Sequence, residues 1–311
     1  MSSLTDLASR IQQRHSDWIQ RWMLRHAGPP ANKMYHYTDA HGLLGIVQNR
    51  AFWASDIRHL NDRTELEHGI GLVRKRLDEA ARRRGSGKAA SALAGIRETF
   101  HGFDVLLTAY ACCFCEDGDL LSQWRGYGRS GGGYAIGISP IATRGNPPPP
   151  PRVSLRKIIY ELDEKLALID ESIATLEKLM DVVFKDSSAD WNEATRILNG
   201  FFRQEVGDYL WCFKHHAFKE EKEWRFCYIT GPADPSPLPL QFRPAPGGVV
   251  PYVDIDLFNL GDAEHHYLEI SDIVCGPTLD SQRSVETIDT LLRKCDLPNV
   301  DVRPSGVPIR R

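Results

Sequence analysis

The sequence has no long apolar run and no excess of charge of one sign. No segment approaches the ~18 consecutive apolar residues of a membrane-spanning helix, and the first residues lack the basic and apolar regions of a signal peptide. The 38 basic and 41 acidic side chains give a formal net charge of -3, so nothing attracts the whole chain to nucleic acid or anionic lipid. We therefore expect no membrane partner and a cytoplasmic location.

Cysteines in disulfide or metal-binding spacing are also missing. The seven cysteines are odd in number and no C-x-x-C occurs. Cys112 and Cys113 are adjacent, so on a strand they would point to opposite faces. The glycines match neither G-x-G-x-x-G after a strand nor a P-loop. We expect reduced thiols, no metal site, and neither a Rossmann nor a Walker nucleotide site.

The sequence does contain helical and strand periodicities in alternation. Helical patterns cover 4–27, a segment capped by Asp39, 63–84, 89–101, 120–127, 161–184, 190–217 and 281–295. Strand patterns cover 34–37, 51–57, 105–115, 134–138, 223–230, 267–275 and 299–303. The proline-rich residues 231–251 are expected to form a long loop, and the five prolines 147–151 a stiff connector.

These elements predict an α+β fold class. Each side of the polyproline connector holds only three or four short strands, too few for a well-covered sheet. We therefore expect one α+β domain over 31–311, with a helical insertion at about 161–217, preceded by a helical extension over 1–30.

The first of four polar clusters is Tyr35-His36-Tyr37-Thr38. Strand alternation puts His36 and Thr38 on one face. An imidazole beside a hydroxyl suits a ribose diol or an amide. A histidine hydrogen-bonded at the edge of the core explains the pattern equally well.

The second cluster begins with Ser55 and Asp56 at a strand end. It continues into Asn61, Asp62 and Glu65 at the start of a helix. Helix capping by Asn61 or Asp62 is the favoured interpretation. The same helix N-terminus would also offer free N–H groups to a phosphate.

The third cluster is Ser122-Gln123-Trp124-Arg125-Gly126-Tyr127-Gly128. An arginine between aromatic residues and glycines suits recognition of a phosphate or a stacked ring. The glycines by themselves indicate only turns.

The fourth cluster is Lys219 to Phe226. On a strand, Glu221, Glu223 and Arg225 would share one face, which is either solvent-exposed or part of a cleft. A carboxylate beside an arginine stays ionised at neutral pH, so Glu223 suits stabilisation of a cation better than general-acid chemistry. Since that face is exposed in both interpretations, Glu223→Gln is expected to leave the fold intact.

Together these segments resemble the bacterial family known as domain of unknown function 2971. The shared motifs are H-Y-T, N-D-x-x-E, C-F-x to W-x-x-Y-G, K to E-W-R, and S-x-x-P-x-R. Here they are His36-Tyr37-Thr38, Asn61 to Glu65, Cys113 to Gly128, Lys214 to Arg225, and Ser305 to Arg310. Arg63 replaces the usual proline and Cys115 the usual serine.

The order of the motifs is also similar to the ADP-ribosyltransferase fold. That resemblance implies two small, mostly antiparallel sheets forming a cleft that binds NAD as substrate, with peripheral helices. It implies that Glu223 is the catalytic carboxylate, which stabilises an oxocarbenium-like transition state. The implied NAD-binding residues are His36, Tyr37, Thr38, Ser55, Arg125, Tyr127 and Tyr134, and the other candidates are Asn61, Asp62, Glu65, Trp124, Glu221 and Arg225.

The sequence thus favours an NAD-consuming enzyme that transfers ADP-ribose to a protein, a nucleic acid or water, in toxicity or phage defence. A non-catalytic nucleotide or nucleic-acid binding module stays open as an alternative. A metal-dependent hydrolase built on Asn61, Asp62, Glu65 and Glu223 is a second alternative. The acceptor and the oligomeric state do not follow from the sequence.

Overall fold

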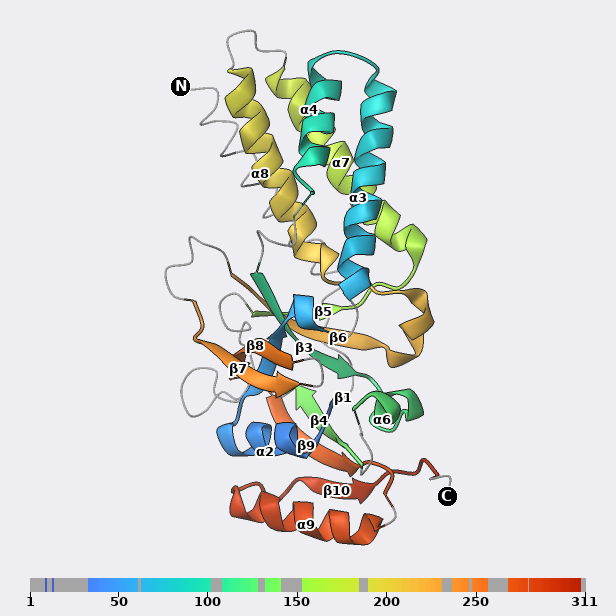
Figure 1. Cartoon of the computed structure of the whole chain (residues 1–311), viewed down its shortest axis with the longest axis vertical. Helices are drawn as coiled ribbons and strands as arrows, with labels where there is room; N and C mark the ends of the chain where they lie inside the picture. Colours follow the sequence, from blue (N-terminus) through green and yellow to red (C-terminus); the bar gives the residue numbers. More distant parts are fainter. Residues whose placement is uncertain are drawn as a thin grey trace. The chain divides into compact units, whose positions relative to one another are not determined.

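The structure is a computed structural model, and it describes most of the chain (Figure 1). The described residues are 33–60, 63–101, 108–127, 132–140, 153–184, 190–230, 237–245, 248–256, 268–278 and 280–308, with Ser9 and Gln13. The expected polyproline connector and, apart from those two residues, the expected N-terminal extension lie outside them. Asn61 and Asp62 lie outside them too.

The chain divides into two compact units. The first consists of Met1–Gly28, Leu60–Thr108 and Ile158–Ala217, and the second of Pro29–His59, Ala109–Lys157 and Phe218–Arg311. The helices of the expected insertion lie in the first unit. That unit also takes in the helices that follow Leu60.

The first unit is helical in its described part. Its helices are α3 (Arg63–Arg84), α4 (Lys88–Glu98), α7 (Leu162–Val183) and α8 (Trp191–Leu210). On α7 the buried side chains recur at helical spacing, as in Leu168, Ile169, Ile173 and Leu176. They form one apolar core with residues of the other three helices. These four helices confirm the predicted ones, except that α8 ends at Leu210 instead of about 217.

The second unit combines a sheet with short helices. The strands are β1 (Met34–Thr38), β2 (Phe52–Asp56), β3 (Thr108–Cys115), β4 (Tyr134–Pro140), β5 (Val153–Lys157), β6 (Glu223–Thr230), β7 (Leu240–Ala245), β8 (Gly248–Ile255), β9 (Leu268–Cys275) and β10 (Asp301–Pro304). The helices are α2 (Ala40–Asn49), α6 (Leu121–Tyr127) and α9 (Ser281–Lys294), with 3-10 turns η1 (Ile57–His59) and η3 (His216–Glu221). Asp39 caps α2 as predicted, because its side chain accepts from the Gly42 N–H.

The strands form one open mixed sheet, and the prediction of two separate sheets is wrong in this respect. The order is β10-β9-β4-β1-β3-β2-β8-β7, and β6 pairs with β3 and β5. One strand, β3, joins both halves: Cys115 pairs with Tyr35 of β1, while Ala111 and Tyr110 pair with β2. The strands β1 and β3 share one register pair, Tyr35↔Cys115. The two halves of the sheet are therefore joined by little strand pairing at this point, which we call the narrow joint.

The prediction of a loop over 231–251 is also wrong, because β7 and the first half of β8 lie there. Prolines argue against strands because they cannot donate to a ladder. Here Pro244 lies on β7, at one end of the strand order, where an unpaired edge tolerates proline. The strand β5 was not predicted.

The sheet has two faces with different surroundings. We name one the Phe114 face: its side chains, including Phe52, Phe114 and Phe226, form the larger core of this unit. We name the other the Tyr37 face, on which Tyr37, Cys115, Ala135 and Val274 pack with Trp124. Because side chains alternate along each strand, neighbours in sequence lie on opposite faces, except at the register shift between β4 and β9.

Candidate functional site

The pleat of the sheet divides the predicted site residues between its two faces. His36, Thr38 and Tyr134 belong to the Phe114 face. Tyr37 and Ser55 belong to the Tyr37 face, by the pairs Tyr35↔Cys115 and Ser55↔Ala111. Glu223 and Arg225 alternate with Trp224 and Phe226, which belong to the Phe114 core, so they also lie on the Tyr37 face.

His36 lies where β1 and β2 separate along β3. Its Nδ1 lies 2.9 Å from the Cys113 carbonyl oxygen, and its ring contacts Phe52 and Phe114. A carbonyl only accepts, so Nδ1 carries the proton and Nε2 is left as an acceptor. Burial lowers the pKa of His36 to about 4, which makes the imidazole neutral at pH 7. Cys112 Sγ lies 3.6 Å from Nδ1, and burial raises the pKa of this thiol.

Thr38 and Tyr134 are directly opposite each other on β1 and β4. Thr38 is buried beneath the first turn of α2. A Cβ atom at Gly42 would lie 1.9 Å from Thr38 Oγ1. The hydroxyl is thus covered by the helix, and close approach of backbone explains the glycine.

Tyr37 has a structural role in the loop between β3 and α6. Its hydroxyl donates to the Asp117 carbonyl and accepts from the Leu120 N–H, both at 2.9 Å. Its ring meets Trp124 edge to face, with centroids 4.8 Å apart. Burial raises the pKa of Tyr37 well above its usual range. The H-Y-T motif therefore fixes the start of α6.

Asp119 belongs to the same loop, and sequence reasoning missed it. Its Oδ1 accepts from Trp124 Nε1 at 2.8 Å and from Ser305 Oγ at 2.5 Å. Its Oδ2 accepts from the Gly306 N–H at 2.7 Å. The spacing of Asp119 and Trp124 in the sequence, D-x-x-x-x-W, was a signal for this residue. The carboxylate ties α6 to the segment that follows β10.

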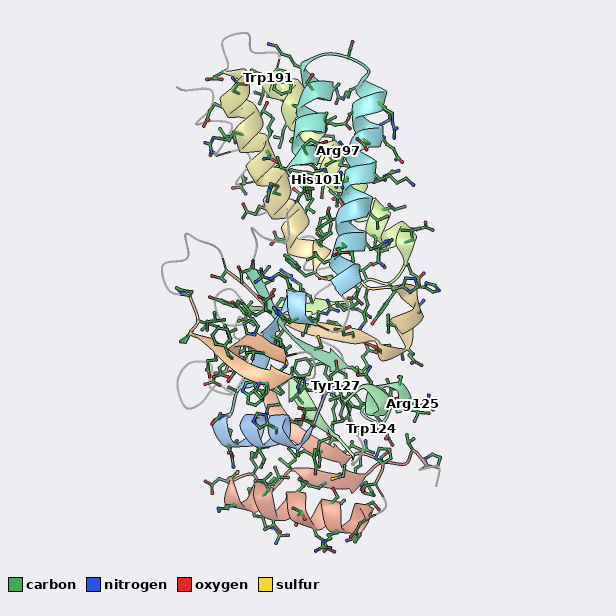
Figure 2. All side chains as sticks on the ribbon, viewed as in Figure 1. Arg97, His101, Trp124, Arg125, Tyr127 and Trp191 are labelled. Atoms are coloured by element: carbon green, nitrogen blue, oxygen red, sulfur yellow. The ribbon has the colours of Figure 1, made fainter. Side chains whose placement is uncertain are left out.

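Arg125 and Tyr127 lie on α6, beside the buried Trp124 (Figure 2). Arg125 is exposed, whereas Tyr127 is half-buried and packs against the Tyr37 side of the sheet. Tyr127 and Tyr134 therefore approach opposite faces of the sheet. The resemblance implied that both tyrosines bind NAD. Because they approach opposite faces, they are alternatives for one stacking position and cannot act there together.

Glu223 and Arg225 form a buried ion pair at the start of β6. Their side chains are 3% and 5% exposed. Arg225 Nε donates to Glu223 Oε1 at 2.6 Å and Nη2 to Oε2 at 3.3 Å. Arg156, which the sequence analysis missed, lies directly opposite Arg225 on β5 and is also buried. Because Glu223 is buried, the expectation of an exposed Glu223 is wrong.

Glu221 does not share this arrangement. It ends the 3-10 turn η3, and the strand begins only at Glu223. Between them Lys222 has φ 42°, in the left-handed region. The predicted alternation Glu221, Glu223, Arg225 is therefore wrong at its first member.

Asn61 and Asp62 of the metal-dependent alternative lie outside the described residues, and its two glutamates belong to different units. Glu65 lies in the helical unit and Glu223 in the sheet unit. Within the described part of the chain, no group of three or more histidine, cysteine, aspartate or glutamate side chains could hold a metal ion.

The side chain of Ser55 contacts a basic residue that was not predicted. Arg243 Nη2 on β7 donates to Ser55 Oγ at 2.9 Å. Arg243 also lies close enough to His36 to lower the pKa of that imidazole further, after burial. Sequence reasoning missed Arg243 because it assigned residues 231–251 to a loop.

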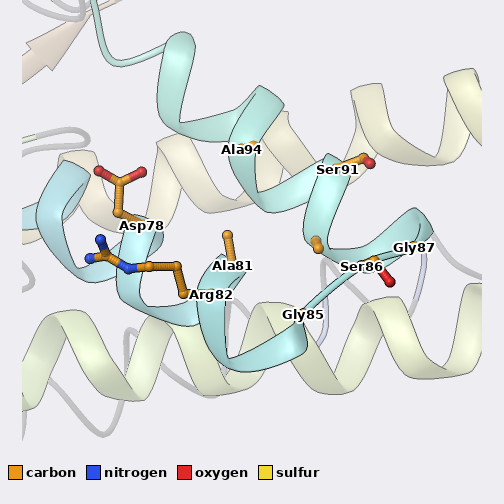
Figure 3. Close-up of a pocket in the computed structure, with 9 residues that line it drawn as sticks. Asp78, Ala81, Arg82, Gly85, Ser86, Gly87, Ser91 and Ala94 are labelled. Carbon is orange, nitrogen blue, oxygen red and sulfur yellow. The ribbon is translucent and has the colours of Figure 1, made fainter.

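A separate pocket of about 500 Å³ lies in the helical unit, where α3 and α4 are joined (Figure 3). Its polar lining comes from Asp78, Arg82, Ser86 and Ser91. None of the predicted site residues lines it.

Among the described residues, no helix is long and apolar enough to cross a membrane.

Comparison with known proteins identifies a family for the middle of the chain. Residues 123–226 match the family described as "Protein of unknown function (DUF2971)". No curated protein and no solved structure matches the chain. The matched segment begins at the residue before Trp124 and ends just after Arg225. It contains the whole Lys214–Arg225 motif and the W-x-x-Y-G end of the Cys113–Gly128 motif. Over these residues, the chain is similar to the DUF2971 family.

Proposed function

We propose that this protein is an NAD-consuming enzyme related to the ADP-ribosyltransferases. The observation that carries the proposal is the Glu223 carboxylate, which is buried, held at two points by Arg225, and set at the first residue of a strand. A carboxylate fixed in this way needs no reorganisation when positive charge develops beside it. Burial also removes water, which would otherwise screen the interaction.

In the proposed reaction, the bond between nicotinamide and C1′ of the ribose breaks. Nicotinamide leaves with the bonding electron pair, and the ribose acquires oxocarbenium character. Glu223 stabilises that charge. Water or a nucleophile of a protein or nucleic acid then forms the new bond to C1′ and loses its proton. The acceptor, and a role in toxicity or defence, belong to the same proposal.

The geometry restricts which residues could contact NAD together with Glu223. The proposed cleft lies on the Tyr37 face, at the narrow joint between the two halves of the sheet, with Ser55 on one wall. Arg125 and Tyr127 on α6 would lie toward its outer edge. For His36 and Thr38, a role in binding requires access from the other face through the gap between β1 and β2. A cytoplasmic location fits NAD as substrate and the seven cysteines, which are all thiols.

The test is release of nicotinamide from NAD by the purified chain. We expect release by wild type and a loss of about 10²–10³-fold with Glu223→Gln. Glu269→Gln, a change of an exposed glutamate on β9, is the matched control and should keep the wild-type rate.

Glu223→Gln also removes the buried carboxylate to which Arg225 donates, so its folding must be measured by circular dichroism and thermal unfolding. Glu223→Asp keeps the charge but withdraws it by one methylene group. It should fold like wild type and still lose most of the activity. Nicotinamide release that survives in folded Glu223→Asp and Glu223→Gln at the wild-type rate would overturn the proposal.

A further inference from the structure

A row of polar side chains crosses three strands on the Tyr37 face. Ser55 of β2 is directly opposite Tyr252 of β8, which is directly opposite Gln241 of β7. Trp53 and Asp254 form the next pair along the same face. Arg243 lies two residues from Gln241, on the same side of β7. All six residues belong to the sheet unit.

Arg243 uses little of its hydrogen-bonding capacity within the described part of the chain. A guanidinium group has five N–H donors, and one of them, on Nη2, bonds Ser55 Oγ. Its Nε is buried and has no hydrogen-bond partner among the described residues. The side chain as a whole is only half-buried, so part of the guanidinium can be reached from outside.

Asp254 has the complementary property. Its Oδ2 accepts from Gln241 Nε2, and Gln241 Oε1 accepts from the Tyr252 hydroxyl at 2.9 Å. Oδ1 of Asp254 is buried and has no partner among the described residues. Arg243 and Asp254 carry opposite charges on one face, yet each is oriented by a neutral neighbour and the two form no ion pair in the described structure. Each of the two side chains thus has one buried polar atom without a partner among the described residues.

Trp53 provides an aromatic surface next to both groups. Its ring is half-buried and lies 5.8 Å from the Arg243 guanidinium, 5.3 Å from Tyr252 and 5.2 Å from His41. An aromatic ring beside an arginine suits a ligand that combines a flat ring with negative charge.

We infer that this face of β2, β7 and β8 binds a nucleotide, through Arg243, Trp53 and Ser55. Arg243 and the Ser55 hydroxyl take the phosphate, since a guanidinium matches phosphate geometry. Asp254 orients Gln241, and through it Tyr252, beside this site. The base lies against Trp53. The inference deepens the proposed function and rests on it where the nucleotide is NAD, because both use Ser55, but it is tested by binding and not by turnover.

The experiment is calorimetric titration of the full chain with ADP, NAD, adenosine and inorganic phosphate. We expect ADP and NAD to bind, and adenosine and phosphate each to bind more weakly than ADP, since each offers only part of the ligand. Arg243→Gln should weaken ADP binding by about tenfold or more, the loss of one charge-assisted hydrogen bond. Arg283→Gln removes an exposed arginine of α9 and should leave the affinity unchanged.

Arg243→Lys serves if Arg243→Gln does not fold. This variant keeps the positive charge but loses the planar guanidinium group with its paired N–H donors, so ADP binding should again weaken. The inference is overturned if folded wild type binds neither ADP nor NAD, or if phosphate alone binds as tightly as ADP. It is also overturned if the folded Arg243 variants bind ADP like wild type. Nucleotide binding that depends on Arg243, without nicotinamide release, would refute the proposed catalysis and support the inference. Nicotinamide release, together with ADP binding by the Arg243 variants that is as tight as in wild type, would support the proposed catalysis and overturn the inference.

Discussion

Asp119 and Ser305 are 186 residues apart in the sequence and share a hydrogen bond of 2.5 Å. The same carboxylate oxygen accepts from the Trp124 indole, and the second oxygen accepts from the Gly306 N–H. Two segments of the family resemblance, Cys113 to Gly128 and Ser305 to Arg310, thus meet at one carboxylate. Their joint function is to hold the α6 loop against the segment after β10.

Asp119→Ala is therefore expected to destabilise the fold without touching the proposed nucleotide contacts. It leaves the buried indole N–H and the Ser305 hydroxyl without their acceptor, and we expect a loss of about 2–3 kcal/mol in the free energy of unfolding. Ser305→Ala should cost about half as much. Urea unfolding of both variants measures the change. Asp289→Ala removes an exposed ion pair on α9 and should cost less than about 0.5 kcal/mol. Equal costs for Asp119→Ala and Asp289→Ala would contradict this role.

The buried pair on β6 predicts an unusual order of stabilities. Glu223→Gln removes the carboxylate of the buried Glu223–Arg225 pair, and we expect a loss of about 3–5 kcal/mol. The double variant Glu223→Gln/Arg225→Met removes both members of the pair and should recover at least about 1 kcal/mol of that loss. Chemical unfolding of the two variants measures this difference. A double variant less stable than Glu223→Gln would show that the buried charge of Arg225 is not the cause.

His36 predicts a pH dependence of stability. Its pKa in the folded protein is about 4, below the ~6.5 of an unfolded histidine, so the unfolded chain binds more protons between these values. Stability is then complete above about pH 6.5 and is lost as the pH falls toward 4. Between pH 6.5 and 5, wild type should lose about 1–2 kcal/mol more than His36→Gln. Parallel curves for the two proteins in this window would mean that His36 titrates normally.

Gly42 predicts a steric effect at the start of α2. In Gly42→Ala the new methyl group would meet Thr38 Oγ1 at 1.9 Å and Thr38 Cβ at 3.2 Å, and a short β-branched side chain cannot move away. We expect a loss of about 1–3 kcal/mol. Gly71→Ala is the matched helical control, since nothing lies within 4 Å of its added carbon. It should gain up to about 1 kcal/mol through helix propensity. Thermal unfolding compares them, and equal behaviour would contradict the packing of α2 on Thr38.

The cysteines predict a pattern of thiol reactivity. All seven are thiols, and only Cys113 and Cys295 are half-buried. The other five are buried, and burial raises the pKa of Cys227 to about 11, which suppresses its reactive thiolate. A thiol reagent at pH 8 should therefore modify two groups in the native protein and seven after unfolding. Rapid native modification of four or more would show that the sheet opens under these conditions.

Local patterns in the sequence determined most of the individual elements. The helix over 63–84 and the strand over 223–230 have the predicted bounds, and Asp39 caps α2, because periodicity, caps and β-branched residues act within a few positions of the chain. The predictions that were wrong concern features that depend on contacts between distant parts of the chain. The strand β7 was hidden by prolines such as Pro244, which the end strand of the sheet tolerates, and that tolerance depends on which strand lies beside which.

The tertiary structure alone decided how the candidate residues are grouped. The sequence placed Glu223 and Arg225 on one side of a strand, and their pairing followed from that. It did not reveal Arg156 opposite them, Arg243 on Ser55, or Ser305 on Asp119, because each contact joins strands or loops far apart in the chain. Nor did it determine that a single sheet would separate His36 from Glu223 on opposite faces. Side-chain direction within a strand is a local property, whereas register between strands is set by the packing of the whole sheet.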